Sequence, residues 1–312
     1  MAAVLAITGP IYIIIAIGWL SARGGLFARA DMRVFGKFVL QLALPALLFH
    51  TLAQRPAAEV LDANYLLAYL AGSLIAGGAG FAWARWGRRK GLAEAALFGL
   101  GTSCSNSGFI GFPLMLQVVG ATAGVALALN MIVENVVILP LALMLAELGR
   151  AAAGGGDWRA ALRQSLLGLL RNPMIVAIVL GLLFAFTGWH LPAPAERAMA
   201  LFATSCGALA LFVIGGSLGG QRVAGLWQDV PAIVAGKLIL HPLAVLAMLW
   251  LLPPADPVLR TAAVVGAAVP MLGIYPVLAQ KYGFEGLCAV VQLVATLSSF
   301  VTLTALLWWL QM

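Results

Sequence analysis

Charge is what this sequence lacks most. Its 312 residues include 18 Lys and Arg and 11 Asp and Glu, which is 9% of the chain, whereas 63% is hydrophobic and the mean hydropathy is +1.03. Soluble globular proteins carry about 25% charged residues. So few charges do not cover the surface of a water-soluble fold, and disorder needs low hydrophobicity and high net charge. The composition therefore predicts an integral membrane protein in contact with the lipid bilayer.

The motifs of catalysis and of metal binding are also absent. The three cysteines, Cys104, Cys206 and Cys288, lie in apolar runs without disulfide or metal-ligand spacing. The sequence contains no HExxH, no GxSxG and no pair of membrane aspartates. We therefore expect neither an enzyme nor a cofactor or metal site, and an intramembrane hydrolase is the least favoured function. The uncharged segment 1–22 lacks the basic start of a signal peptide and is long enough to span a bilayer.

Long apolar stretches alternate with short charged segments. About 20 apolar residues cross a bilayer as a helix. Ten stretches meet this requirement approximately: 3–22, 38–54, 64–84, 95–118, 121–146, 172–190, 198–220, 230–252, 258–280 and 286–311. The predicted fold is thus an all-α, multi-pass membrane protein with ten transmembrane helices.

The basic residues collect on one side of this predicted topology. Segments after odd-numbered helices hold 13 of them: Arg23, Arg29, Arg33, Arg85, Arg88, Arg89, Lys90, Arg150, Arg159, Arg163, Arg171, Arg222 and Lys281. Segments after even-numbered helices hold Arg55, Arg197 and Arg260. Because basic loops stay in the cytoplasm, we predict a protein of the cytoplasmic (inner) membrane with both termini outside the cytoplasm. The net charge of +7 then reflects topology and not a nucleic-acid partner.

The run AAAGGG at residues 151–156 divides the chain into two halves. We predict a first repeat over 1–147, a cytoplasmic linker over 148–171 and a second repeat over 172–312. The linker would hold either a short interfacial helix or an extension of the next transmembrane helix. Five helices per half make any repeat inverted across the membrane, which is typical of secondary transporters.

The fourth and ninth predicted helices share an interruption. Both read aromatic-Pro-x3-Gln-x2-Gly around Pro113 and Pro276, 163 residues apart, and Gly111 and Gly273 precede the prolines. Proline breaks a helix, and the new helix that starts there offers unpaired N–H groups and partial positive charge to an anion. Two matched breaks favour a carboxylate site between them over a pair of ordinary proline kinks.

A few polar side chains lie within the apolar stretches. Asn106 precedes the first break, so its amide is placed either to bind a substrate oxygen or to cap the helix. Glu134 is the one acidic residue deep inside a predicted span, with Asn130 one turn away, and we expect it to act in coupling or gating through a proton or a cation. Lys237 and His241 share a face, and we expect Lys237 to extend its amine toward the cytoplasmic surface, with a gating role for the pair as the alternative.

These motifs resemble the auxin efflux carrier family, which includes plant PIN auxin exporters and bacterial permeases for malonate or malate. The resemblance covers the whole chain and rests on the five-plus-five layout, on Asn106-x6-Pro113-Leu114, and on Ala268-Val-Pro270 followed by Gly273-Ile-Tyr275-Pro276 and Lys281-Tyr282. Plant members have a long cytoplasmic loop where this chain has the short linker.

The resemblance implies an inverted-repeat fold shared with bile-acid/sodium symporters. The first, second, sixth and seventh helices would form a scaffold, and the others a transport unit that moves like an elevator. A small organic carboxylate would bind where the broken helices cross, near Asn106, Gly111, Pro113, Gly273, Tyr275, Pro276 and Asn130. Val269 stands where the second repeat would match Asn106, so the site should be asymmetric. The resemblance also implies a homodimer, and the glycines between Gly215 and Gly220 would serve either that contact or internal packing.

Other functions stay open at this point. A sodium-coupled organic-anion symporter would use Asn106, Glu134, Thr296 and Ser298 as ligands. A passive anion channel is less favoured, because paired broken helices are typical of alternating access. The sequence does not distinguish import from export, nor proton from sodium coupling.

Overall fold

The computed structural model describes residues 2–55, 61–152, 163, 167–168, 170–217, 228–254 and 256–310, with the backbone alone for residues 2–8, 29 and 152. Within these residues the regular structure is entirely helical, with no strand, which confirms the predicted fold class. The predicted linker helix falls largely outside the described residues. The division into ten spans and two inverted repeats stays a prediction.

The first half of the chain forms a series of helices, several of them continuous through short π-helical turns. In order they are α1 (Ala2–Arg23), α2 (Arg29–Phe38), η1 (Val39–Ala43), α3 (Leu44–Ala53), α5 (Ala63–Ala82), η2 (Trp83–Gly87), α6 (Leu92–Ser103), η3 (Ser107–Gly111), α7 (Phe112–Val119), η4 (Gly120–Thr122), α8 (Ala123–Ile132), η5 (Val133–Ile138) and α9 (Leu139–Ala152).

The second half continues in the same way. Its helices are α11 (Pro173–Thr187), α12 (Ala193–Ser217), α13 (Val230–Ala235), η6 (Gly236–Leu240), α14 (His241–Leu251), α15 (Pro257–Ala268), α16 (Tyr275–Gln280) and α17 (Glu285–Leu310). Six helical segments of the described chain are long and apolar enough to cross a membrane: 30–53, 63–87, 107–151, 193–217, 230–251 and 285–310. Three shorter apolar helices cover 9–23, 173–187 and 257–268.

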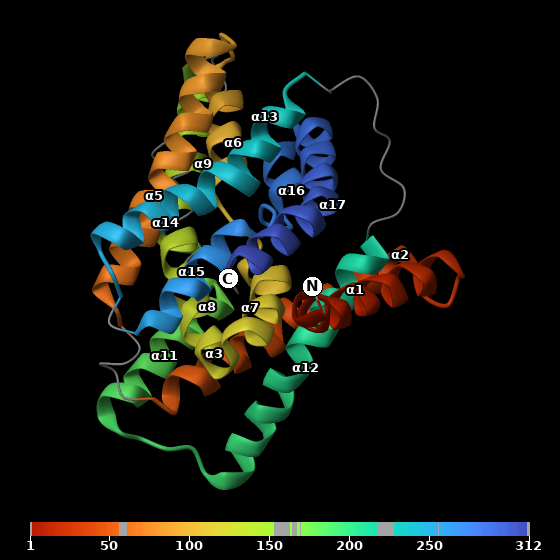
Figure 1. Cartoon of the computed structure of the whole chain (residues 1–312), viewed down its shortest axis with the longest axis vertical. Helices are drawn as coiled ribbons and strands as arrows, with labels where there is room; N and C mark the ends of the chain where they lie inside the picture. The colour runs from red at the N-terminus through yellow and green to blue at the C-terminus, as the bar shows by residue number, and fades with distance from the viewer. Residues whose placement is uncertain are drawn as a thin grey trace.

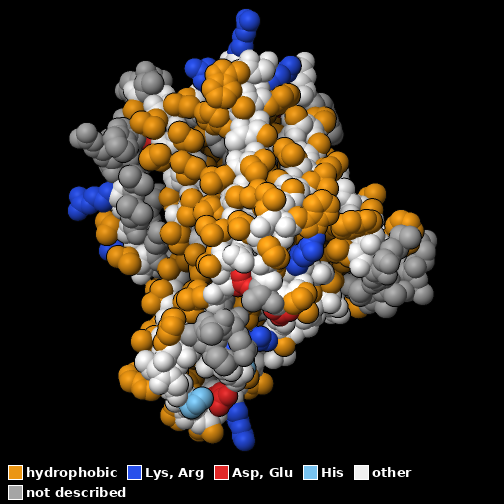
Figure 2. Space-filling view, turned by 60° about the vertical axis from the view of Figure 1, so that its left-hand side comes forward, with side chains coloured by type: hydrophobic (Ala, Val, Ile, Leu, Met, Phe, Trp, Pro, Cys, Tyr) orange, Lys and Arg blue, Asp and Glu red, His pale blue; other side chains and the backbone are white. Residues whose placement is uncertain are grey.

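The helices pack in two sets. In the first set, α12 packs against α1 and α3, and α3 packs against α11. In the second set, α5 packs against α6 and α14, and α6 packs against α9. Figure 1 shows α7, α8 and α15 near the middle of the molecule, with α5, α6, α9 and α14 together on one side and α1, α2 and α12 on the other. Hydrophobic side chains cover most of the face in Figure 2, and several Lys and Arg side chains project at its upper end, as a membrane-embedded surface requires.

Small residues let the first set of helices approach closely. A side chain at Gly215 would collide with the backbone of Ile15, and one at Gly18 would collide with the backbone of Phe212. Lipid chains are as apolar as leucine, so close backbone packing is a main source of helix association in a membrane. Of the two interpretations of the Gly215–Gly220 glycines, the structure shows internal packing for Gly215, against α1.

Both predicted interruptions are present, although the first lies earlier than expected. The helix α6 ends at Ser103, residues 104–106 are not helical, and η3 begins at Ser107. Pro113 is therefore not the point where the new half-helix begins. The chain is already helical from Ser107, because η3 precedes α7 without a break. The wider π-helical hydrogen bonding of η3 thus comes before Pro113, which lies in the first turn of α7. In the second half, α15 ends at Ala268 and α16 begins at Tyr275 with Pro276 in its first turn, as predicted.

Two glycines of α5 test the close packing of the second set. A Cβ at Gly72 would lie 2.6 Å from the backbone of Val245 in α14, whereas a Cβ at Gly78 meets nothing within 4 Å. We expect Gly72→Ala to lower the free energy of unfolding by roughly 1–3 kcal/mol through overpacking. Gly78→Ala, the matched control, should melt with or slightly above the parent protein in detergent. Equal melting temperatures for the two variants would contradict this packing.

Candidate functional site

The two interrupted segments cross and pair through their backbones. The N–H of Asn106 donates to the carbonyl of Pro270 (2.8 Å), and the N–H of Leu272 donates to the carbonyl of Cys104 (3.2 Å). Ser105 and Met271 thereby form an isolated antiparallel bridge. A broken helix in an apolar environment leaves backbone groups without partners, and here each break supplies partners to the other. We call residues 104–106 and 269–274 the crossing segments.

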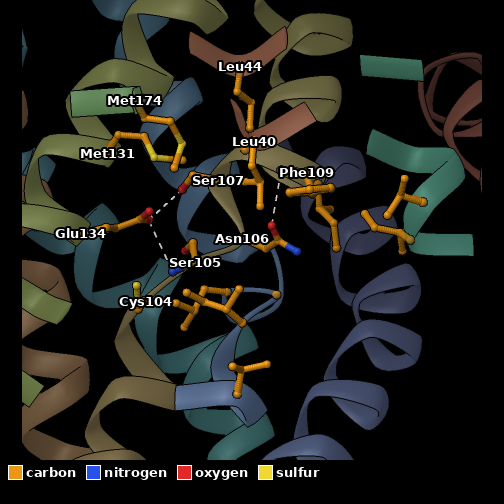
Figure 3. Close-up of a pocket in the computed structure, with 18 of the residues that line it drawn as sticks. Leu40, Leu44, Cys104, Ser105, Asn106, Ser107, Phe109, Met131, Glu134 and Met174 are labelled. Carbon is orange, nitrogen blue, oxygen red and sulfur yellow. Dashed lines mark hydrogen bonds between the residues drawn. The ribbon is translucent and has the colours of Figure 1, made fainter. Parts of the chain in front are cut away.

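A cavity of about 900 Å³ lies beside the crossing. Its wall includes polar side chains and backbone from both halves of the chain, and Figure 3 shows part of it. The polar and charged residues that line it are Arg33, Gln41, Ser105, Asn106, Ser107, Glu134, Asn135, Asn172, Ser217, Gln292 and Thr296. Apolar side chains such as Leu40, Leu44, Phe109 and Met174 form most of the remainder.

Asn106 presents a free amide nitrogen beside this cavity. Its Oδ1 accepts from the N–H of Phe109 (3.3 Å) and so caps the helix that starts at Ser107. No hydrogen bond engages Nδ2 within the described chain, and in Figure 3 this nitrogen points away from Glu134. A side chain at Gly273 would begin 3.7 Å from Nδ2, so the glycine leaves the amide accessible. Gln292 fixes this segment by donating to the carbonyl of Gly273 (3.0 Å).

Glu134 lies on the other side of the first crossing segment. Its Oε1 accepts from the hydroxyls of Ser107 (2.7 Å) and Tyr69 (3.0 Å) and from the N–H of Ser105 (3.4 Å). Figure 3 shows the carboxylate directed toward Ser105 and Ser107. The side chain is buried yet lines the cavity wall. Three donors converging on one oxygen satisfy a carboxylate where water does not reach it, and the second oxygen keeps its accepting capacity.

Lys237 does not extend to the surface, so that expectation was wrong. Its side chain is 0% exposed, and its Nζ donates to the carbonyl of Ala267 (2.6 Å) and to Ser105 Oγ (3.0 Å) and lies 3.0 Å from His241 Nδ1. A buried ammonium needs an acceptor for each proton, and these three atoms supply them. The other ring nitrogen of His241, Nε2, is hydrogen-bonded to Ser73 Oγ (2.9 Å).

Ser105 thus connects the two charged groups. Its N–H reaches Glu134 and its hydroxyl accepts from Lys237, so a crossing segment passes between a carboxylate and an ammonium. Three short π-helical turns hold these residues: Ser107 lies in η3, Glu134 in η5 and Lys237 in η6. Such turns are frequent at functional sites because the extra residue redirects side chains.

The sequence analysis missed the contribution of α5. Tyr65, Tyr69 and Ser73 are fully buried, and their hydroxyls bind Asn130 Oδ1 (2.8 Å), Glu134 and His241 respectively. These three residues repeat every four positions, which places them on one face of a helix. A stripe of hydroxyls at this spacing inside an apolar helix was the signal that could have found them.

Four of the predicted substrate-binding residues do not line the cavity. Asn130 is buried against Tyr65 and Gly266, and Gly111 lies near the backbone of Asn106 and the side chain of Val269. Pro113 packs toward Gly207, and Tyr275 donates its hydroxyl to the carbonyl of Leu97 (2.9 Å) in α6. Asn106, Glu134, Gly273 and Pro276 are brought to the cavity wall, and Lys237 and His241 lie behind Ser105.

Comparison with known proteins identifies the family of the chain. The model of a family described as "Membrane transport protein" matches residues 4–154 and 157–308. The chain belongs to this family. The resemblance drawn from the sequence is thereby confirmed, and the interval between the two matched segments falls within the AAAGGG run.

Curated members of the family resemble this membrane transport protein along most of its length. A Rhizobium meliloti (strain 1021) protein named "Putative malonate transporter" is 30% identical over 99% of this chain and 96% of its own. An Escherichia coli (strain K12) protein named "Uncharacterized transporter YfdV" is 28% identical over 76% of this chain and 75% of its own. The family and the names of these relatives indicate a transporter and not an enzyme.

The hydrogen bonds of Lys237 make a prediction for this transporter. In Lys237→Met three acceptors lose a donor, and unpaired buried polar groups cost about 1–3 kcal/mol each. We expect the variant to melt well below the parent protein in detergent. Lys37→Met, which changes an exposed lysine, should leave the melting temperature nearly unchanged. Equal melting of both variants would show that the network does not stabilise the crossing.

Proposed function

We propose that this protein is a secondary transporter that carries a small organic carboxylate across the cytoplasmic membrane. The observation that carries the proposal is the crossing of two interrupted helices at the wall of a cavity, with the free amide nitrogen of Asn106 beside it. The name of the Rhizobium meliloti relative, which mentions malonate, supports a carboxylate as the substrate class.

The chemistry of the crossing suits an anion. The helix formed by η3 and α7 begins at Ser107 with its N-terminus at the crossing, and such a terminus carries partial positive charge. The amide of Asn106 adds a neutral donor, and the Lys237 amine lies behind Ser105, where Glu134 is the opposite charge. A carboxylate held at Asn106 would thus meet the amide donor and the helix N-terminus, with Glu134 bonded to Ser105 and Ser107 on the other side of the segment.

The way in which the helices pack supports a mechanism of alternating access. In this proposal ten spans form two inverted repeats of five. The set α1, α2, α3, α11 and α12 acts as scaffold, and the remaining helices act as a transport unit that moves like an elevator. Ion pairs link the two halves of that unit. Lys90 binds Asp229 (2.8 Å) ahead of α13, and Glu147 of α9 binds Lys281 (2.5 Å) after α16. The bonds that Lys90 makes with Asp229 and Glu94 raise the pKa of its ammonium group, so the first link persists at neutral pH.

The position of the cavity supports one conformational state of the proposed transporter. Besides the crossing, its wall includes Arg33 near the start of α2, Asn172 before α11 and Ser217 at the end of α12. These helix ends adjoin the basic segments that the charge distribution assigns to the cytoplasm. The proposal therefore assigns the structure to a cytoplasm-open state, with both termini outside and the homodimer that the resemblance implies.

Glu134 is the proposed coupling residue. Its three hydrogen bonds converge on Oε1, which leaves Oε2 to take up a proton or to bind sodium. A carboxylate in the apolar interior is costly to keep charged and is a functional group by default. Thr296 also lines the cavity, as the sodium-coupled alternative requires, whereas Ser298 lies in a separate groove beside α13.

Asn106→Ala tests the binding site. We expect the purified variant to stay folded but to lose at least about tenfold in affinity, because one good hydrogen bond to a charged group contributes about 1.5–3 kcal/mol. The measurement is a thermal-shift screen of mono- and dicarboxylates, followed by uptake into proteoliposomes. Asn135→Ala is the matched control, since Asn135 lines the same cavity but its amide is bonded to the carbonyl of Met131 (2.9 Å). Unchanged affinity and rate in Asn106→Ala would refute the assigned site.

Glu134→Gln tests the coupling. Glutamine keeps the shape and the accepting Oε1 but does not exchange a proton. We expect the variant to bind substrate and to exchange internal for external substrate, while losing accumulation driven by a gradient. Proteoliposomes with an imposed proton gradient, and separately with a sodium gradient, identify the ion in the parent protein. Accumulation by the variant at the parent's level would make Glu134 a structural residue.

A further inference from the structure

The cavity contains one cation that its hydrogen bonds do not explain. Arg33 is exposed and lines the wall, and among the lining residues it is the single Lys or Arg. Within the described residues it makes no ion pair and no hydrogen bond. The acidic lining residue, Glu134, lies at the crossing and is already bonded by three donors. A free positive charge therefore faces the cavity at one end.

The helix geometry places this charge well away from the crossing. Arg33, Leu40, Gln41 and Leu44 all line the cavity along the continuous helix from α2 through η1 to α3. Leu44 reaches the crossing region, because a Cβ at Gly108 would lie 2.8 Å from its Cδ1. Eleven residues of helix rise roughly 16 Å. A compact dicarboxylate is too short to contact Asn106 and Arg33 together, so Arg33 acts on the anion before it is bound.

We propose that Arg33 is a substrate-recruiting residue, whose positive charge at the mouth of the cavity draws anions inward and favours dianions over monoanions. This inference rests on the proposed function for the identity of the cargo. The claim that Arg33 makes the cavity attractive to anions does not rest on it, because that claim concerns the electrostatic potential of the cavity and not the cargo. A fixed charge in a cleft with low-dielectric walls concentrates the counter-charge and raises the association rate in a salt-dependent way.

Coulomb's law sets the size of the effect. Two unit charges about 16 Å apart in water change a local concentration by about 1.5-fold, and a dianion experiences about a 2.4-fold change. Reversing the charge of the residue squares these factors. At 1 M salt the screening length falls to about 3 Å, and the effect disappears.

The first experiment measures the potential in the cavity without any substrate. Cysteine is introduced at Ile274 or, separately, at Val277, which are exposed cavity-lining residues. The native cysteines are buried, but Cys104 lines the same cavity, so it is replaced by alanine in every variant, including the reference protein. Each variant is treated with an anionic or a cationic methanethiosulfonate reagent, and the ratio of the two rates is measured. Arg33→Gln should lower the anionic-to-cationic ratio about 2.4-fold at low salt, and Arg33→Glu about sixfold, while Arg33→Lys should keep it.

Arg85→Gln is the matched control, since Arg85 is an exposed arginine that does not line the cavity. It should leave the ratio unchanged. A ratio in Arg33→Gln equal to that of Arg85→Gln at both reporter positions overturns the proposal, whatever the cargo is.

The second experiment measures malonate uptake by proteoliposomes. We expect Arg33→Gln to raise the KM for malonate about 2.4-fold at low ionic strength with kcat unchanged, and the inhibition constant of the monoanion malonamate about 1.5-fold. Both differences should vanish at 1 M salt. A salt-independent loss of kcat would instead make Arg33 part of the moving machinery and overturn recruitment. If the parent protein takes up no carboxylate, the proposed function fails, and the thiol rates still decide whether Arg33 draws anions into the cavity.

Discussion

The structure depends on the rule that backbone groups inside an apolar environment must find partners within the protein. Two interrupted helices break this rule at the same depth, and they restore it by pairing with each other. The N–H of Asn106 donates to Pro270, and the N–H of Leu272 donates to Cys104. Neither half of the chain supplies these partners alone. The pairing therefore explains why the two breaks lie together, and why the residues around them are held in place well enough to form a site.

The charged groups of the interior follow from this pairing. Once Ser105 is fixed by the crossing, its N–H reaches Glu134 and its hydroxyl reaches Lys237. Each charge is completed by partners from other helices, Tyr69 for the carboxylate and His241 for the ammonium. Burial of a charge is tolerated when it is paired and hydrogen-bonded. In the proposed mechanism this network is the link between the position of the crossing segment and the protonation or ion occupancy of Glu134.

Features that depend on neighbouring residues in the chain could be predicted from the sequence, whereas features that depend on distant residues could not. Proline and glycine act on their own backbone, so both interruptions were predictable, and Asn106 and Glu134 stood out as polar groups in apolar runs. The register of a π turn is not written in local composition, so the start of the helix at Ser107 instead of Pro113 was missed. The side-chain direction of Lys237 was also missed, because its acceptors Ser105 and Ala267 are distant in the chain. The α5 hydroxyls were visible as a pattern, but their partners come only from the fold.

The two halves of the chain contribute different groups to the candidate site, so the site is asymmetric. In the first half Asn106 caps a helix that starts at once, so its amide nitrogen is held beside the cavity. In the second half Val269 occupies the corresponding place, the segment 269–274 stays non-helical, and Gly273 provides the open approach to that nitrogen. An amide on both segments would crowd the approach, and a glycine on both would leave no donor. One half thus supplies the donor and the other the space, so in the proposed mechanism a change in the relative position of the two crossing segments alters substrate affinity. A transporter that alternates between two states requires such a dependence, because its affinity must respond to the same motion that changes access.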